Sequence, residues 1–305
     1  MTPGAPDLFG RPLAPDPRIA LPSLPPRALR DGPLPRVQFT VELVGQYTSR
    51  APSVAPLLSQ PWHSNLGQPQ VFVLRPGDSD WIRLIPNQNE EYDSILLAWD
   101  YVSDQGQLSF NSASHLLNMA ESFANQIGRK AVSLTDIALV EDIAKSLRQI
   151  ESELDTGLSV GVVGGMAVFE RDLWILCSGL GLSFSPTGSF DWLVPQHPHP
   201  VLSVTPIGST ESFSLANVQA GLSHQGVSIG FRLATCPAAT VAAEGVFRVA
   251  DVIAQAIHGT VFDDSQRSLT PHIRAEIKRD LDTAITFLSK AGLAPGSPEA
   301  LKIFV

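Results

Sequence analysis

Hydrophobic and polar positions alternate in the first part of the folded sequence, and a two-residue period is typical of strands that bury one face. In residues 37–45, VQFTVELVG, the residues Val37, Phe39, Val41 and Leu43 fall on one side. The same reasoning predicts a hairpin from residues 70–77 and 80–86 and a further strand at 92–102. These segments predict one antiparallel sheet.

Helical periodicity follows this set of strands. Residues 112–128 end at a glycine and carry an apolar stripe made of Leu116, Met119, Ala120, Phe123 and Ile127. Residues 134–155 form a second predicted helix, which opens with a threonine as its N-cap.

The pattern then starts again. Strands are predicted at 157–164, 182–195 (as a strand pair or one bulged strand), 201–207, 211–219, 226–235 and 260–264. Helices are predicted at 170–181, 247–259 and 270–292, the last with a proline in its first turn. Both halves thus end with an amphipathic helix that stops at Gly128 or Gly259, a short strand and a threonine-capped long helix, which indicates a tandem duplication.

The predicted fold class is α+β, with two tandem domains that each pack helices on one face of a mainly antiparallel sheet. The first domain spans 36–155 and is a divergent copy of the second, which spans 156–305. Residues 1–35 are rich in proline and have no usable period, so we expect an extended, disordered arm. Trp99 and Tyr101 belong either to the core of the first domain or to a contact surface, and the core is the preferred interpretation.

Composition narrows the choice of function. The net charge of −9 and the absence of a Lys/Arg cluster argue against a nucleic-acid partner. Two cysteines without a CxxC motif, Cys177 and Cys236, predict buried free thiols in a reducing, cytoplasmic compartment. No apolar run reaches the roughly 18 to 20 residues that span a bilayer, and no signal peptide is recognisable, so we expect no transmembrane segment in this chain.

Adjacent carboxylates at Asp263 and Asp264 suggest either a metal-dependent hydrolase or a turn at the end of a strand. The turn is preferred, because aspartate side chains bond nearby backbone N–H groups and no further ligand has metal-site spacing. His197 and His199 lie between prolines without a partner cluster and predict an exposed loop. Since no nucleophile or phosphate-binding motif occurs either, we expect no catalytic residues, no metal, no cofactor and no enzymatic activity.

A more informative pattern is the alternation in residues 226–235. Val227, Ile229, Phe231 and Leu233 point toward the helices, while Ser228, Gly230 and Arg232 point the other way. We expect the latter three to form a weakly apolar sheet surface together with Leu158, Val160, Ala216 and Val218. Such a surface is either merely solvated or a groove for a partner peptide.

At these residues the chain resembles the C-terminal FtsZ-binding domain of the ZipA family. The resemblance covers about residues 157–292 in order and depends on FSLAN (213–217), GVSIGF (226–231) and VFDDSQRSLTP (261–271). The closing GLAPGSPEALKIF is similar to the tail of proteobacterial members that carry an extra, related upstream domain. Residues 36–155 match in pattern only.

The resemblance implies a non-enzymatic cell-division scaffold that binds the C-terminal tail peptide of FtsZ at the septum. The residues that it implies as the peptide site are Leu158, Val160, Thr187, Ala216, Val218, Ser228, Gly230 and Arg232. The family commonly has a large apolar residue where Thr187 stands and an aromatic one where Gly230 stands. Loss of the aromatic predicts a roughly ten- to hundredfold weaker affinity, which Arg232 would offset if the peptide is acidic.

The family's membrane anchor is missing from this chain. The chain is therefore interpreted either as a truncated protein or as a soluble relative that cannot itself tether filaments to the membrane, with any membrane association being indirect, through other division proteins. A different division-site partner and the Asp263/Asp264 hydrolase are the alternative functions.

Overall fold

The computed structural model describes residues 21, 23, 32–62, 67–85, 90–104, 106–195 and 197–304. Most of the arm predicted over 1–35 lies outside the described residues. The chain divides into two compact units, which we describe separately. The first unit comprises Leu29–Glu153 with Leu301–Val305, and the second contains Leu154–Ala300. Antiparallel sheets combine with helices in each, so the fold class is α+β, as the sequence predicts.

In the first unit the strands are β1 (Gln38–Val44), β2 (Ser49–Arg50), β3 (Gln70–Leu74), β4 (Ile82–Arg83), β5 (Glu91–Tyr92), β6 (Ser94–Asp100), β7 (Val102–Ser103), β8 (Gly106–Gln107) and β9 (Lys130–Ser133). The helices are α1 (Ala51–Val54), η2 (Ala55–Leu58), α2 (Phe110–Gln126), η3 (Ile137–Leu139) and α3 (Val140–Leu154). The predicted strands and helices are thus present, but α3 begins with a 3₁₀ turn that Asp136 caps. The prediction of a threonine N-cap at this helix was wrong.

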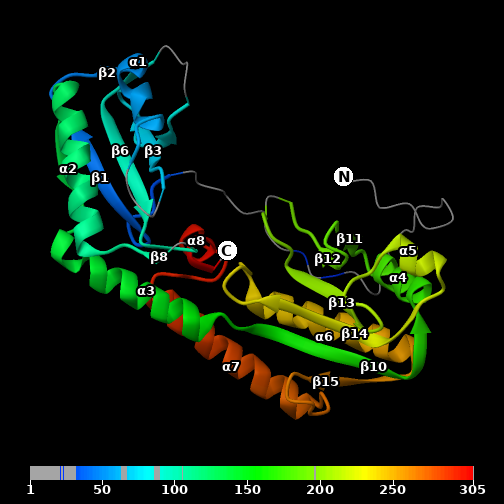
Figure 1. Cartoon of the computed structure of the whole chain (residues 1–305). Helices are drawn as coiled ribbons and strands as arrows, with labels where there is room; N and C mark the ends of the chain where they lie inside the picture. Colours follow the sequence, from blue (N-terminus) through cyan, green and yellow to red (C-terminus); the bar gives the residue numbers. More distant parts are fainter. Residues whose placement is uncertain are drawn as a thin grey trace. The chain divides into compact units, whose positions relative to one another are not determined.

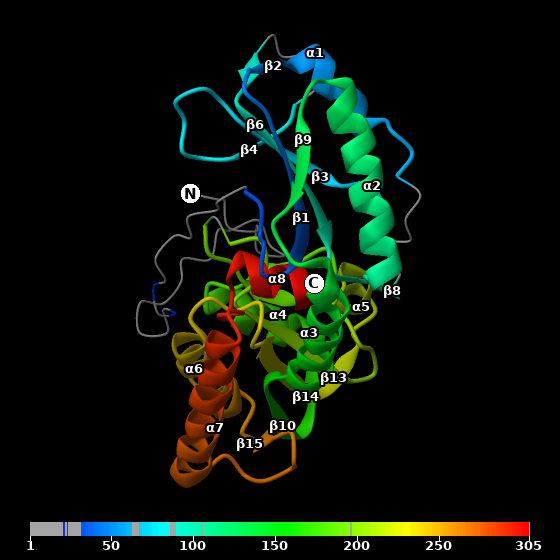
Figure 2. The ribbon, with the colours of Figure 1, turned by 90° about the vertical axis from the view of Figure 1, so that its left-hand side faces the viewer.

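The main sheet of the first unit has the order β4-β3-β6-β1-β9. The helix α2 packs against β1 and β9 on one face (Figure 2). On the other face Phe72, Leu96 and Ala98 form a buried cluster against Trp81, which comes from the β3–β4 hairpin. Trp99 and Tyr101 are also fully buried, so they belong to the core of this unit.

In the second unit the strands are β10 (Gly157–Phe169), β11 (Ser183–Phe184), β12 (Phe190–Trp192), β13 (Leu202–Gly208), β14 (Ser223–Arg232) and β15 (Gly259–Asp263). The helices are α4 (Glu170–Gly179), α5 (Leu215–Gln219), α6 (Ala239–Ala256) and α7 (Pro271–Lys290). The predicted threonine cap of the last helix is confirmed, because the Thr270 side chain accepts a hydrogen bond from the backbone N–H of Ile273.

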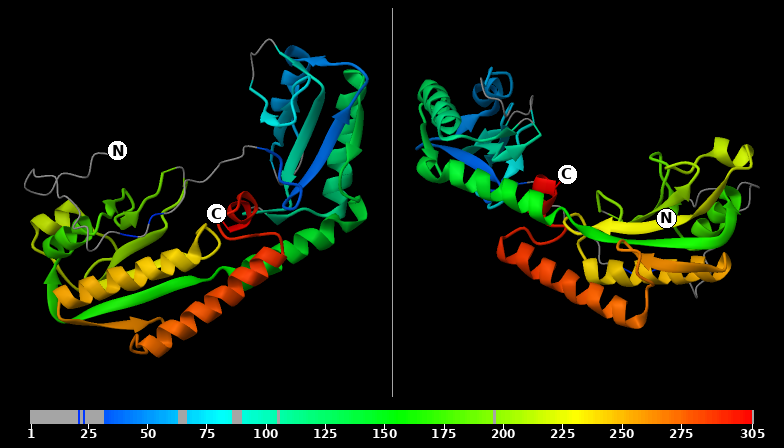
Figure 3. Two further views of the ribbon diagram at one scale, coloured as in Figure 1. Left: turned by 180° about the vertical axis from the view of Figure 1, so that it is seen from behind. Right: turned by 60° about the horizontal axis from the view of Figure 1, so that its bottom comes forward.

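The sheet of the second unit has the order β11-β12-β13-β14-β10-β15 (Figure 1). The helix α6 packs on β10, β13, β14 and β15, and α7 packs on α6. Figure 3 shows both helices on the same side of the sheet. Gly245 lets α6 approach Trp192 of β12 closely, since a Cβ atom at position 245 would lie 3.0 Å from the Trp192 ring.

The two sheets share one strand order. If β1, β3, β6 and β9 are numbered first to fourth along the chain, their spatial order is second, third, first, fourth, and β10, β13, β14 and β15 repeat it. A helix follows the third strand in each unit (α2 and α6), and another follows the fourth (α3 and α7). A tandem duplication predicts this agreement.

The end of the chain folds as a short helix that the sequence analysis missed, α8 (Pro298–Phe304). Lys302 forms an ion pair of 2.9 Å with Asp100 on β6. Residues from Leu301 onward therefore group with the first unit, whereas the sequence analysis placed them in the second domain. A terminal segment that follows one repeat in the sequence but groups with the other leaves no periodic signal.

Candidate functional site

The antiparallel register decides which residues share a face of the second unit's sheet. Val160 pairs with Ile229, and both are buried on the side where α6 packs. Gly161 pairs with Ser228, which pairs in turn with Thr205, and all three are partly exposed. We call this second side the outer face. By register it consists of Ser159, Gly161, Val163, Ser203, Thr205, Ile207, Gly226, Ser228, Gly230, Thr260 and Phe262.

Glycines make the middle of the outer face shallow, but for different reasons. A Cβ atom on Gly226 or Gly230 would stand 1.8 or 2.5 Å from a backbone carbonyl oxygen of β10, so the sheet itself requires these glycines. A Cβ atom on Gly161 would meet only the Cδ1 atom of Ile207, at an ordinary 3.6 Å. Gly161 is therefore the position where the outer face has room for a side chain of a ligand.

Polar groups lie beside this glycine row. The hydroxyl groups of Ser159 and Ser228 are 3.2 Å apart and hydrogen-bond to each other. At the end of β14, Arg232 donates from Nε and Nη2 to the Oδ1 atom of Asp155, at 3.1 and 2.8 Å. The predicted outward direction of Ser228, Gly230 and Arg232 agrees with their exposure. Arg232 and Asp155 are each about half exposed in this ion pair, and the attraction of an acidic peptide by Arg232 stays a prediction.

The structure corrects the positions of Leu158 and Val160, which were expected on the outer face. Both side chains are buried, with 6% and 1% of their surfaces exposed, and Val160 pairs with the buried Ile229. Their neighbours Ser159 and Gly161 occupy the outer face instead. A one-residue shift along a strand moves every side chain to the other face. The expected positions of Leu158 and Val160 were wrong by such a shift.

Ala216 and Val218 were expected on a strand, but they lie on the short helix α5. Ser214 caps this helix by accepting a hydrogen bond from the backbone N–H of Asn217, and Gly221 follows it with a φ of 67°. An N-cap serine and a C-terminal glycine are recognisable helix signals. They were available in SLANVQAG, and the prediction of a strand there was wrong.

Thr187 lies in the turn that joins β11 and β12, at one edge of the sheet. Its hydroxyl group is within hydrogen-bonding distance of the hydroxyls of Ser185 and Ser189, at 2.9 and 3.2 Å. The structure thus brings Ser228 and Gly230 together on the outer face, with Arg232 at its end and Thr187 at its edge.

The adjacent aspartates differ in their surroundings. Asp263 is 3% exposed, and its Oδ1 and Oδ2 atoms accept hydrogen bonds of 2.7 Å from the backbone N–H and the Nε of Arg267. Burial alone would raise the pKa of Asp263, but these hydrogen bonds from Arg267 outweigh burial and hold the pKa below its usual range. Asp264 is exposed. The pair therefore forms a turn between β15 and α7, as the sequence analysis preferred.

A buried ionisable pair lies elsewhere in the second unit, and the sequence analysis missed it. Nε2 of His224 is 2.7 Å from Oε2 of Glu170, and both side chains are fully buried. Oε1 of Glu170 accepts a hydrogen bond from the backbone N–H of Ser214, at 2.6 Å, while Nδ1 of His224 has no partner in the described structure. The pair joins the start of α4, the cap of α5 and β14, which is a structural role.

Neither metal ligation nor thiol chemistry finds support in the described part of the chain. No group of three or more His, Cys, Asp or Glu residues that could hold a metal ion occurs there, and this includes His197 and His199. Both cysteines are free and buried, as predicted. Burial raises the pKa of Cys177 to about 12 and that of Cys236 to about 11.

No protein-family profile matches the chain, and a search of characterised proteins finds no significant match. The resemblance to the ZipA family therefore stays a prediction from the residues themselves. Among the helices within the described ranges, none combines the length and apolarity needed to cross a membrane.

Proposed function

We propose that the second unit is a non-enzymatic peptide-binding module and that the outer face holds the C-terminal tail peptide of FtsZ. The protein would then be a scaffold that helps to organise the division ring. The observation that carries the proposal is the outer face, whose residues apart from the buried Gly226 are at least partly exposed and lie opposite the side that α6 covers. The resemblance of residues 157–292 to the FtsZ-binding domain supplies the candidate partner.

The outer face offers a ligand a glycine floor between two apolar side chains. Gly161 pairs with Phe262 of β15 on one side, and the Ile207 side chain of β13 reaches toward it on the other. Both Phe262 and Ile207 are partly exposed. An apolar side chain of the peptide that rests on Gly161 would remove all three from water, and burial of apolar surface stabilises a complex by about 25 cal/mol per Å².

The first unit differs at the corresponding place. On the face of its sheet that carries Phe72, Leu96 and Ala98, the Trp81 side chain already packs against these residues. That cluster is occupied by the chain itself, so we assign peptide binding to the second unit.

Two alternatives lead to different experimental results. A different division-site protein could bind the outer face, because this face lacks the bulky residues that the ZipA family commonly has at Thr187 and Gly230. A metal-dependent hydrolase at Asp263 and Asp264 is less well supported, since Arg267 already occupies both oxygen atoms of Asp263. The hydrolase would be favoured if divalent cations, added after treatment with a chelator, raise the thermal stability of the protein and if the Asp263→Asn variant does not show this increase.

The test is a titration of the protein with a fluorescein-labelled FtsZ tail peptide, followed by fluorescence anisotropy. Ser228→Lys places a long charged side chain beside Gly161 and should weaken binding by about tenfold or more, since a desolvated charge opposes apolar contact. Thr286→Lys adds the same charge on an exposed turn of α7 and should leave affinity unchanged. Absence of binding at millimolar peptide, with the protein folded, would reject FtsZ as the partner.

A further inference from the structure

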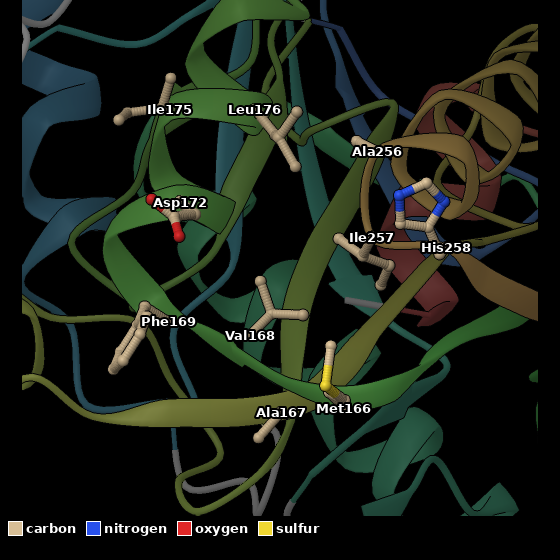
Figure 4. A pocket seen from close by; sticks show the side chains of 10 residues that line it. All are labelled: Met166, Ala167, Val168, Phe169, Asp172, Ile175, Leu176, Ala256, Ile257 and His258. Carbon is tan, nitrogen blue, oxygen red and sulfur yellow. The ribbon is translucent and has the colours of Figure 1, made fainter.

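A depression separate from the outer face lies where β10 ends. It has a volume of about 480 Å³ and lies between the end of β10, the start of α4 and the C-terminal end of α6. Figure 4 shows Val168, Leu176 and Ile257 directed into it. The lining is therefore mostly apolar, and it shares no residue with the outer face.

Large apolar side chains also surround this depression. Met166 is 84% exposed, Phe169 59% and Ile175 39%. All three border the same cavity, from the end of β10 and the first turns of α4. Single exposed apolar residues are common on protein surfaces, whereas several that gather beside one cavity are a feature of interaction sites.

The backbone next to the depression indicates what could bind there. The pairing of β10 with β15 stops at Gly164, opposite Gly259, and its pairing with β14 is interrupted between Val163 and Val168. Residues 165–167 therefore have no ladder partner among the described strands, and all three are exposed. Unpaired strand backbone of this kind can accept one more extended segment, which contributes its own N–H and C=O groups.

Charge complements this geometry. The Asp172 side chain lies at the rim of the depression (Figure 4) and is exposed, and no cation pairs with it in the described part of the chain. The ring of His258 lies on the opposite rim. The neighbouring Arg171 interacts with another group. A basic residue in the bound segment would thus find an unpaired carboxylate.

We propose that this depression binds a short extended segment of a partner protein that carries apolar side chains and a lysine or arginine. The apolar side chains enter the cavity between Leu176 and Ile257. The backbone lies along residues 165–167, and the basic group reaches Asp172. This site is independent of the outer face, so neither site requires the other to be correct.

Methionine NMR gives a local readout, because the chain has three methionines. In the 305-residue chain labelled with ¹³C at the methionine methyl groups, Met166→Leu assigns the signal of Met166. The probes are the blocked peptides Leu-Lys-Leu-Lys-Leu and Leu-Glu-Leu-Glu-Leu. We expect the lysine peptide to shift the Met166 signal saturably, without a change in the signal of Met119. The glutamate peptide should bind at least about tenfold more weakly than the lysine peptide.

Variants distinguish binding at this site from nonspecific binding of the peptide. Phe169→Ala and Asp172→Asn should each weaken binding of the lysine peptide several-fold, because they remove an apolar contact and the paired charge. Phe287→Ala removes a ring of similar exposure from α7 (51%, against 59% for Phe169) and should have no effect. The proposal is overturned if both peptides bind equally, if Asp172→Asn binds the lysine peptide as the unmodified protein does, or if neither peptide shifts the Met166 signal.

Discussion

Glu170 and His224 approach to 2.7 Å in an environment from which water is excluded. They connect three elements that are distant along the chain, because Glu170 begins α4, His224 lies in β14, and Ser214, which also binds Glu170, caps α5. The ring of Phe213 packs edge-on against His224 at 6.0 Å. This relationship explains how the segment between β13 and β14 is held in place.

Loss of either partner of this pair should destabilise the second unit. Glu170→Ala leaves the His224 ring and the N–H of Ser214 buried without an acceptor, and removal of one partner of a buried pair costs on the order of 3 to 5 kcal/mol. Urea unfolding measures the loss. Glu211→Ala, at an exposed site, is the matched control and should change the free energy of unfolding by less than about 0.5 kcal/mol. A loss below about 1 kcal/mol for Glu170→Ala would contradict the proposed structural role.

Glycines of the outer face should differ in their tolerance of alanine. Gly226→Ala would press a Cβ atom against the carbonyl oxygen of Val162, so the sheet must distort, and overpacking of this kind costs about 1 to 3 kcal/mol or more. Gly161→Ala meets only ordinary contacts and should be nearly neutral. Thermal unfolding of the two variants compares them directly. Equal destabilisation would show that the spacing between β10 and β14 differs from the one described.

Asp263 should stabilise the protein in a pH-dependent way. Its folded-state pKa is lowered, so the ionised side chain stabilises the fold above the unfolded-state pKa, and this contribution disappears as pH falls through the folded-state pKa. Asp263→Asn should therefore be less stable than the unmodified protein near neutral pH, and the difference should shrink in strong acid. Urea unfolding midpoints of both proteins, measured from neutral pH to strong acid, test the expectation. A difference in stability between the two proteins that does not depend on pH would contradict it.

The two thiols should be unreactive in the folded protein. Since burial raises the pKa of Cys177 to about 12 and that of Cys236 to about 11, both remain protonated near neutral pH, and the thiolate is the reactive form. A disulfide reagent such as DTNB should react only after urea is added, and then with both thiols. Rapid reaction of the native protein would show that one of them is accessible.

Local sequence patterns predicted most, but not all, of the secondary structure. The long strands and helices follow the alternation and the apolar stripes of the chain, because each element must bury its apolar side whatever its neighbours are. Thr270 and Pro271 mark the start of α7 in the sequence as they do in the structure. In contrast, α5 was predicted as a strand, although Ser214 and Gly221 provided the caps of a helix.

The sequence by itself determined the α+β class, the repeated order of elements and the turn at Asp263 and Asp264, since these depend on residues close together along the chain. Only the tertiary structure decided that Ser159 and Gly161, rather than Leu158 and Val160, share the outer face with Ser228. Strand pairing sets this choice, and it joins residues almost 70 positions apart, as in the contact between Ser159 and Ser228. The buried Glu170–His224 pair and the depression beside Met166 depend on the same long-range packing, which no local pattern records.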